Sequence, residues 1–454
     1  MLLPLLLISL ASAQDWPRFR GPNGTGVAPD TNLPAELSST KNVIWRVPLP
    51  AGHSSPVISN GRIFLTAFEK DKLYTICLKQ QTGELLWRME SPRTRNVEVD
   101  NRNSPASPSP VADGKNVFIF FQDYGLISYT FDGKERWRTP LGPFDNIYGL
   151  GASPILTDGK LILVVDQSSK SYAAAFDPNT GKQLWKTPRE EALSGHSTPS
   201  VAGNLIYAPG SFRMDVYNAS TGAIDWTLSG LASEMKSVPV IVGDTLYING
   251  YNTPTNDPGR QVAVPDFADV IAKFDADKDG RISVSESPDE RTKKYFPYID
   301  LNKDGFMDAA EWKAYQLSMA AENGLLAIDI NTHKVKWKFH KSIPQLPSTL
   351  LYKDVLYMIN DSGILTTLNP TTGEVYKQAR LRGAADNFYA SPVAADGKVY
   401  FVSKAGVVTV LKAGGQQELL TSGELDDECV ATPAIVGGRI YIRTRSALYA
   451  FGKK

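Results

Sequence analysis

Hydrophobic and polar positions alternate with a period of two along most of the chain, in short runs separated by Asp-Gly and Thr-Gly turns. The stretch 153–185 is representative: apolar runs at 161–165 and 172–176 lie between such turns, and Trp185 follows the last turn. Runs of this kind predict β-strands, and tight Gly turns between them predict antiparallel hairpins. The stretch therefore predicts four short antiparallel strands, with Trp185 closing the fourth.

The same unit recurs along the chain with constant internal spacing. Each copy opens on a Pro, or on Thr in the sixth, and has an aromatic or aliphatic residue eight positions later. A Pro is tolerated at the first residue of a strand, because it cannot donate to the hydrogen-bond ladder. The eight pairs are Pro56/Phe64, Pro110/Phe118, Pro154/Ile162, Pro199/Tyr207, Pro239/Tyr247, Thr349/Tyr357, Pro392/Tyr400 and Pro433/Tyr441.

A repeat of about 40 to 45 residues with four strands is typical of a β-propeller blade, because one small sheet buries its faces only against neighbouring sheets. The eighth copy ends at Phe451, after its third strand. Residues 42–46 precede the first copy and include Trp45, so we expect this segment to supply the missing fourth strand and close the ring. The predicted fold class is an all-β, eight-bladed propeller of four-stranded antiparallel blades.

The fifth copy is interrupted between its second strand, expected to end near Tyr251, and its third, expected from Leu325. Residues 252–259 are rich in Pro, Asn and Asp, which favours a linker. Inside the insert the pattern changes to a helical period at 267–274 and 309–320. Beside these helices lie two twelve-residue stretches, 275–286 and 300–311, that have the EF-hand calcium-loop pattern.

The two stretches carry oxygen-bearing residues at the spacing that calcium requires. A loop of this length wraps around one ion only if its sixth residue makes a sharp turn, and Gly280 and Gly305 occupy that position. Without a cation the carboxylates would repel one another. The expected ligands, with position 7 contributing its backbone carbonyl, are Asp275, Asp277, Asp279, Arg281, Ser283 and Glu286 in the first loop, and Asp300, Asn302, Asp304, Phe306, Asp308 and Glu311 in the second.

The spacing of the two loops predicts a compact module. Ile282 and Met307 are expected to pair between the loops, while Pro288 and Pro297 are expected to interrupt the connecting helices. Little sequence is then left for the lever arms of a calcium sensor, so we expect a constitutively loaded structural module.

In a propeller the loops that lead into each first strand and those between the second and third strands emerge on one face. We therefore expect the residue three positions before each opening Pro to line the mouth of the central channel, with the polar loop 93–102 on its rim. Four polar side chains at that position are candidate ligand-binding residues; a hydrated mouth without a ligand is the simpler alternative. The eight residues are His53, Ser107, Gly151, His196, Lys236, Leu346, Tyr389 and Val430, and the candidates among them are His53, His196, Lys236 and Tyr389.

Residues 1–13 combine a short apolar run with the small residues that precede signal-peptidase cleavage, which predicts a periplasmic or secreted protein. No Cys follows the cleavage point, so a lipid anchor is not expected. The run is too short to span a bilayer. The aromatic-rich extension 14–41 is expected to pack across the propeller, although its Arg residues leave open a partner surface.

The amino-acid composition limits the classes of partner that the protein is expected to bind. Lys plus Arg and Asp plus Glu each number 48, so bulk charge does not favour nucleic acid. Cys77 and Cys429 fall in copies one and eight, which a closed ring makes neighbours, and either a disulfide or two buried thiols fits this placement. A monomer is expected.

The turn that precedes Trp185, with Thr180-Gly181, resembles the tryptophan-docking motif of the PQQ-like (pyrroloquinoline quinone repeat) β-propeller family, and Thr82-Gly83, Thr221-Gly222 and Thr372-Gly373 repeat it. The resemblance covers about residues 42–451 without the insert. It is greatest to exported bacterial members with an EF-hand pair in one blade, and extends more distantly to the outer-membrane assembly propeller lipoprotein. In these proteins the motif joins blades and does not itself bind quinone.

The sequence therefore predicts domains at 1–13 (signal peptide), 14–41 (extension), 42–251 (blades one to four and the first part of blade five), 252–321 (EF-hand pair) and 322–454 (the rest of blade five and blades six to eight). We expect an exported calcium-binding scaffold for a protein or small ligand on the propeller face. The alternative is a quinone-dependent oxidoreductase of alcohols or sugars that uses the channel mouth; glycan-binding and hydrolytic roles are further alternatives. Related dehydrogenases use a catalytic Asp and a calcium held by Glu and Asn, and no such set maps onto this sequence, so no catalytic residue is assigned.

Overall fold

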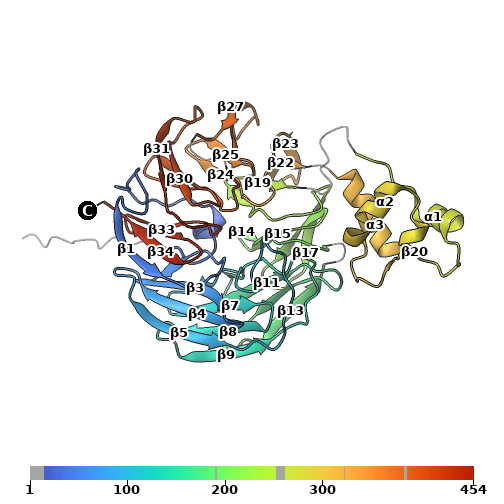
Figure 1. Ribbon diagram of the computed structural model, residues 1–454, viewed down its shortest axis with the longest axis horizontal. Helices are drawn as coiled ribbons and strands as arrows, with labels where there is room; N and C mark the ends of the chain where they lie inside the picture. Colours follow the sequence, from blue (N-terminus) through green and yellow to red (C-terminus); the bar gives the residue numbers. More distant parts are fainter. Residues whose placement is uncertain (1–14, 190–191, 252–260, 322, 383–385, 454) are drawn as a thin grey trace, which may run out of the picture.

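Eight four-stranded antiparallel sheets form a closed ring in the computed structural model, which describes residues 15–189, 192–251, 261–321, 323–382 and 386–453 (Figure 1). The expected signal peptide at 1–13 and linker at 252–259 lie outside the described residues. No helix in the described ranges combines the length and apolar character needed to cross a membrane.

Each blade runs from a short inner strand to a solvent-facing outer strand. Blades 1 to 4 consist of β2 Val57–Ser59, β3 Arg62–Glu69, β4 Lys72–Lys79 and β5 Leu85–Ser91; β6 Val111–Ala112, β7 Asn116–Phe121, β8 Gly125–Thr130 and β9 Glu135–Pro140; β10 Ile155–Thr157, β11 Lys160–Val165, β12 Tyr172–Phe176 and β13 Gln183–Pro188; β14 Ser200–Ala202, β15 Leu205–Gly210, β16 Arg213–Asn218 and β17 Ile224–Ser229. Blades 5 to 8 consist of β18 Val240–Val242, β19 Thr245–Gly250, β22 Gly324–Asp329 and β23 Val335–Phe339; β24 Leu350–Tyr352, β25 Val355–Ile359, β26 Ile364–Leu368 and β27 Val375–Arg380; β28 Val393–Ala395, β29 Lys398–Val402, β30 Val407–Lys412 and β31 Leu419–Glu424; β32 Ala434–Val436, β33 Arg439–Arg443, β34 Ala447–Phe451 and β1 Val43–Pro48.

The eighth blade joins the two ends of the described chain. Its strand order is β32-β33-β34-β1, and Arg46 of β1 pairs with Tyr449 of β34. This confirms the predicted ring closure by the N-terminal strand. Without β1, the outer edge of β34 would lack a partner in this blade.

The docking motif ties neighbouring blades together at several junctions of the ring. Trp137 donates its indole N–H to the carbonyl of Pro178 at 2.9 Å, and its ring packs against Gly181, where a Cβ would lie only 2.5 Å from the ring. Trp45 packs in the same way on Gly83 across the closing seam. The prediction that the Trp closes the outer strand is wrong, because Trp185 is the third residue of β13 and the strand continues over an alternating, half-exposed edge.

A ring of hydroxyl groups joins the inner strands. In seven links the residue before the strand-opening position donates its backbone N–H to a Ser or Thr hydroxyl of the next blade, as Ser55 does to Ser109 at 2.9 Å. The link is missing where Val238 has no hydroxyl to offer, and there Ser200 instead donates to the carbonyl of Pro239 at 2.6 Å. These bonds fix the inner strands around the channel, which is where the candidate ligand residues begin.

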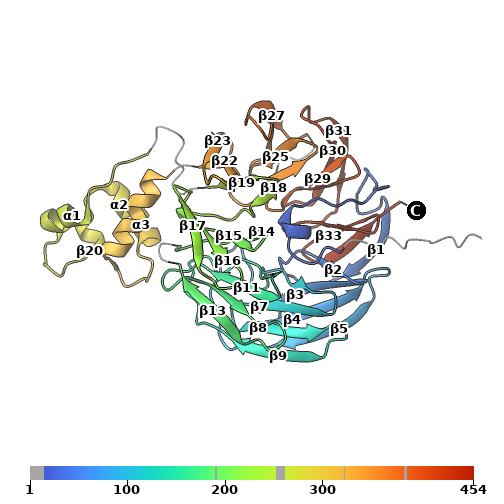
Figure 2. The same cartoon turned by 180° about the vertical axis from the view of Figure 1, so that it is seen from behind.

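The insert forms a separate helical module at the side of the ring (Figures 1 and 2). Its elements are α1 Phe267–Phe274, β20 Ile282–Ser283, η2 Val284–Glu286, α2 Glu290–Ile299, β21 Phe306–Met307 and α3 Ala309–Ala320. The predicted helices and the pairing of Ile282 with Met307 are confirmed. The expectation that Pro297 interrupts a helix is wrong, because α2 continues through it, and the module has its own core around Trp312.

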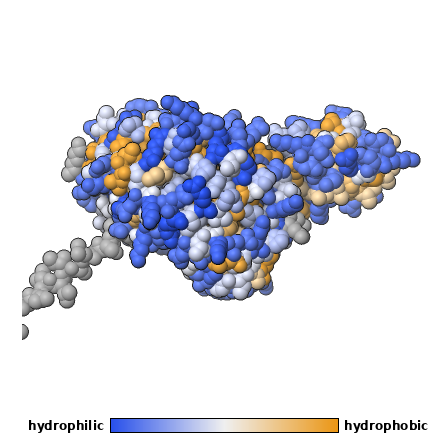
Figure 3. Space-filling model, turned by 90° about the horizontal axis from the view of Figure 1, so that it is seen from below, coloured by the Kyte–Doolittle hydropathy of each residue, from blue (hydrophilic) through white to orange (hydrophobic). Residues whose placement is uncertain are grey.

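Hydrophobic residues on the face shown in Figure 3 lie in small groups among polar ones. Cys77 and Cys429 are both buried as free thiols, and burial raises the pKa of each to about 12. The two thiols therefore belong to the packed core, which is the second of the two alternatives that the sequence left open.

Candidate functional site

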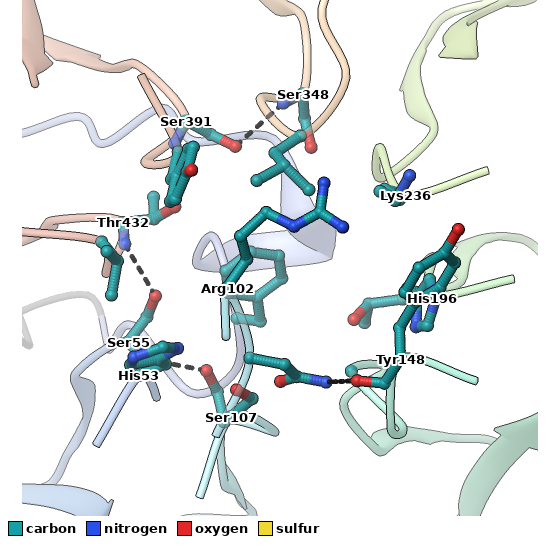
Figure 4. A pocket seen from close by; sticks show the side chains of 18 of the residues that line it. His53, Ser55, Arg102, Ser107, Tyr148, His196, Lys236, Ser348, Ser391 and Thr432 are labelled. Atoms are coloured by element: carbon teal, nitrogen blue, oxygen red, sulfur yellow. Dashed lines mark hydrogen bonds between the residues drawn. The ribbon is translucent and has the colours of Figure 1, made fainter. Parts of the chain in front are cut away.

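All eight residues at the repeat position three before the strand opening line one cavity of about 200 Å³ at the channel mouth (Figure 4). His53 and His196 lie on opposite walls, and Lys236 lies above His196. The geometric expectation from the repeat spacing is met at every copy. That His53, His196, Lys236 and Tyr389 bind a ligand stays a prediction.

The N-terminal extension forms the floor of this cavity. Trp16 pairs with Ile58 of blade 1, Arg18 donates to the carbonyl of Pro199 in blade 4 at 2.6 Å, and Arg20 donates to the carbonyl of Thr349 at the start of blade 6 at 3.0 Å. The short η1 turn, Pro22–Gly24, lies near the centre of the ring in Figure 2. Because Phe19 faces the cavity from this segment, the mouth is a cup and not the end of an open channel.

Two ion pairs compensate the charges in the cup. Arg102, from the rim loop after blade 1, projects into the cavity and pairs with Asp100 at 2.7 Å. Lys236 pairs with Glu234, which also accepts a hydrogen bond from the Tyr148 hydroxyl at 3.0 Å. The four formal charges cancel, so the cup offers many hydrogen-bonding groups but little net charge.

The two histidines in the cup are held neutral. Burial lowers the pKa of His196 to about 4, with a smaller contribution from Lys236. Burial also lowers the pKa of His53 to about 4, and Arg443, Arg445 and Lys404 add to this effect. Each neutral imidazole can donate one hydrogen bond and accept one, which suits a polar ligand.

Sequence reasoning missed several residues of the cup. Phe19, Arg102, Tyr148 and Glu234 line it but stand outside the repeat position. Arg102 belongs to the polar loop that was expected on the rim, and Phe19 to the extension that was expected to pack across the propeller, so a signal existed for both. Tyr148 and Glu234 are brought in by chain segments whose course only the folded ring defines.

The first calcium-type loop has a geometry that fits a cation. Oxygen atoms of Asp275, Asp277 and Glu286 lie within 4.8 Å of one another, the one such group of three among the described residues. The Oδ1 atom of Asp275 is buried without a hydrogen-bond partner. Gly280, at position 6, has a φ of 80°, as the sharp turn requires. Hydrogen bonds from Ser283, foremost its hydroxyl, lower the pKa of Glu286 to about 2, so this carboxylate is ionised and available.

The second loop repeats the turn and the carboxylate hydrogen bonds of the first. Gly305 has a φ of 86° and donates to Asp300 at 2.9 Å, and Glu311 accepts the backbone N–H of Leu301 at 2.8 Å. Among the described residues, however, only the first loop brings three carboxylate oxygens together. The Arg281 guanidinium lies 3.1 Å from Asp279 and 3.4 Å from Asp304, so it bridges position 5 of both loops. Among the remaining predicted ligands, Ser283 donates its hydroxyl to Glu286 at 2.7 Å, Asn302 accepts the backbone N–H of Asp304 at 2.9 Å, and Asp308 caps the N-terminus of α3. That these groups and the carbonyls of Arg281 and Phe306 bind calcium stays a prediction.

The module borders the cup. A second cavity, of about 80 Å³, lies between the module and the ring, with Tyr298 and Leu301 on the module side. Tyr148 and Glu234 line both this cavity and the cup. The second calcium-type loop and the mouth are therefore separated by a single layer of side chains.

Comparison with known proteins identifies relatives with this architecture. A family model described as outer membrane protein assembly factor BamB matches residues 27–146, 75–269 and 258–454. Tetrathionate hydrolase of Acidithiobacillus ferrooxidans is 24% identical over 429 residues, 86% of this chain and 77% of that protein. Quinoprotein alcohol dehydrogenase PedH of Pseudomonas putida is 24% identical over 192 residues, 38% of this chain and 31% of that enzyme. The crystal structure of BamB from Moraxella catarrhalis superposes with a TM-score of 0.58 at 13% identity, covering 90% of this chain and 99% of that one.

Proposed function

This chain belongs to the PQQ-like repeat family described as outer membrane protein assembly factor BamB, and from that premise we propose that it is an exported, calcium-binding scaffold that holds a protein segment or small ligand at its channel mouth. The observation that carries the proposal is the cup: eight equivalent repeat positions converge on one cavity that the N-terminal extension closes from below. A closed floor makes a binding cup, whereas an open channel would only be filled with water.

Calcium is the proposed resident ion of the helical module. Asp275, Asp277 and Glu286 supply converging oxygens. The Oδ1 atom of Asp275 is buried without a hydrogen-bond partner, and a bound cation would replace the missing interaction. With the ion present, the position of α2 and its following loop against the rim would be fixed. The module is thus expected to stiffen one wall of the cup.

The binding role is tested with the full chain and matched variants. Immobilised protein is exposed to a periplasmic extract, and captured components are compared with those of the double variant Lys236→Gln/Tyr389→Ala. We expect a specific component to be lost in the double variant but kept with Lys182→Gln, because Lys182 is an exposed side chain on an outer turn. Equal capture by all three proteins would contradict the proposal.

Calcium binding is tested by equilibrium dialysis with calcium alone. Glu286→Gln should abolish uptake at the first loop, while Glu290→Gln, an exposed acidic residue paired with Lys293 on α2, should leave it unchanged. Intact calcium uptake in the double variant Glu286→Gln/Glu311→Gln would refute the metal assignment.

A quinone-dependent oxidoreductase is the second candidate, favoured by the similarity to quinoprotein alcohol dehydrogenase PedH. The donor set of the mouth does not fit a calcium-bound quinone, because Asp100 and Glu234 are each held by their own cation and no third acidic group joins them within the described residues. The two functions are separated by adding pyrroloquinoline quinone and calcium to the purified protein. A stoichiometric bound chromophore with dye-linked oxidation of an alcohol or sugar would replace the scaffold proposal.

A further inference from the structure

A third cavity, of about 420 Å³, opens beside the cup between blades 7, 8 and 1, and is called the basic cavity. Its lining includes one histidine and five charged residues, namely His53, Arg102, Lys404, Glu428, Arg443 and Arg445. Four of these six are permanent cations at neutral pH and one is a carboxylate. The cup has balanced charges, so the two adjoining cavities differ in the ligand chemistry that they favour.

The single carboxylate of the basic cavity does not neutralise its cations. Glu428 lies 3.2 Å from the Arg445 guanidinium and 3.9 Å from the Lys404 ammonium, and is therefore shared between two cations. Arg102 is paired outside this set, with Asp100. The cavity keeps an excess of positive charge.

Arg443 supplies a fixed charge at the base of the cavity. The residue is 1% exposed, and its guanidinium donates to the Ser54 carbonyl at 3.0 Å and to the Ser54 hydroxyl at 2.7 Å. Among the described residues no carboxylate lies within ion-pair distance of it. Gly52 makes room for this group, because a Cβ there would lie 2.6 Å from its Nη2 atom. A buried cation that only neutral partners hold is costly and favours an anion nearby.

The same cations act on His53. Burial is the main cause that lowers the pKa of this imidazole, and Arg443, Arg445 and Lys404 lower it further. Three cations thus act on one point between the basic cavity and the cup, which both include His53 and Tyr389.

We propose that the basic cavity binds a small oxyanion such as sulfate or phosphate, either free or as the charged group of a larger ligand that extends into the cup. Lys404 and Arg445 are 37% and 70% exposed in their side chains and can turn toward the anion, and Arg443 attracts it from below. Planar guanidinium groups match the geometry of an oxyanion. Glu428 competes with the anion for the same two cations.

Because Glu428 competes with the anion, removing its charge should change sulfate affinity in the opposite direction from removing a cation. Sulfate is titrated calorimetrically into the full-length protein at low ionic strength. Lys404→Gln and Arg445→Gln should each weaken binding about tenfold, since a charge-assisted hydrogen bond is lost. Glu428→Gln should instead tighten binding several-fold, because both cations are released. Glu418→Gln, which removes a similarly exposed carboxylate paired with Lys412 on the outer edge of blade 7, should leave sulfate affinity unchanged.

The outcomes separate this site from the cup. Unchanged or weaker sulfate binding in Glu428→Gln, or no sulfate binding by the wild-type protein, would overturn the proposal. Lys236→Gln, which alters the cup but lies outside the basic cavity, should not change sulfate affinity even if it abolishes capture of a partner. Titration with glucose 6-phosphate then distinguishes the sources: affinity equal to that of inorganic phosphate indicates a free oxyanion, and higher affinity that Tyr389→Ala removes indicates a larger ligand.

Discussion

The contact between Trp137 and Gly181 allows a matched test of what holds the blades together. Gly181 has a φ of 71°, and a Cβ there would lie 2.5 Å from the Trp137 ring and 2.6 Å from the Thr139 hydroxyl oxygen. Gly159 has a φ of 66°, but a Cβ there would meet no atom within 4 Å. The substitutions Gly181→Ala and Gly159→Ala therefore share the backbone strain and differ in the inter-blade contact.

The magnitudes follow from these two environments. An Ala in the left-handed region costs about 1 kcal/mol in both variants, and the loss of unfolded-state freedom offsets part of it equally. Only Gly181→Ala adds overpacking, about 1–3 kcal/mol, and displaces the indole from its hydrogen bond to Pro178, about 1 kcal/mol. The free energy of unfolding should thus fall about 2–4 kcal/mol further in Gly181→Ala than in Gly159→Ala.

Urea unfolding followed by tryptophan fluorescence measures the free energy of unfolding of both variants. A third variant, Trp137→Phe, and its combination with Gly181→Ala complete a double-mutant cycle. If the methyl group added by Gly181→Ala clashes with the Trp137 ring, replacing that ring by the smaller Phe relieves the clash. Trp137→Phe should then lower the free energy of unfolding less in the Gly181→Ala background than in the wild type. Equal destabilisation by the two Gly substitutions would refute the account of the docking motif as an inter-blade joint.

Three further predictions concern the floor, the histidines and the module. Trp16→Ala, at a 1% exposed position, should cost about 3–5 kcal/mol and make the N-terminal extension sensitive to protease, as measured by limited proteolysis. The pKa values of His53 and His196 are about 4 in the fold against 6.5 ordinarily, so the unfolded chain binds more protons between these values. The free energy of unfolding should therefore fall as pH decreases from about 6.5 to 4, and His196→Gln should make this slope shallower in urea titrations. Chelation of calcium should lower the melting temperature of the module while the ring stays folded, seen in calorimetry as a shift of one transition only; a shift of both would contradict their independence.

Much of the fold follows from the sequence because propeller repeats are local. A blade forms from consecutive strands, so turn residues and two-residue alternation near Pro154 or Trp185 suffice to predict it. The constant register also predicts that His53, His196, Lys236 and Tyr389 meet at the mouth, although they are far apart in the chain. The calcium-type loops are equally local, since twelve consecutive residues contain the oxygens and the Gly that turns them.

The tertiary structure alone decided what surrounds those local units. Contacts between distant segments, which no periodicity encodes, decide the course of the extension under the ring, the burial of Arg443 against Ser54, and the sharing of Glu428 by two cations. The same holds for the module, whose helices the sequence predicts but whose position beside Tyr148 it does not. Pattern fixes which residues share an element, whereas charge balance and closure of a cavity depend on which elements become neighbours.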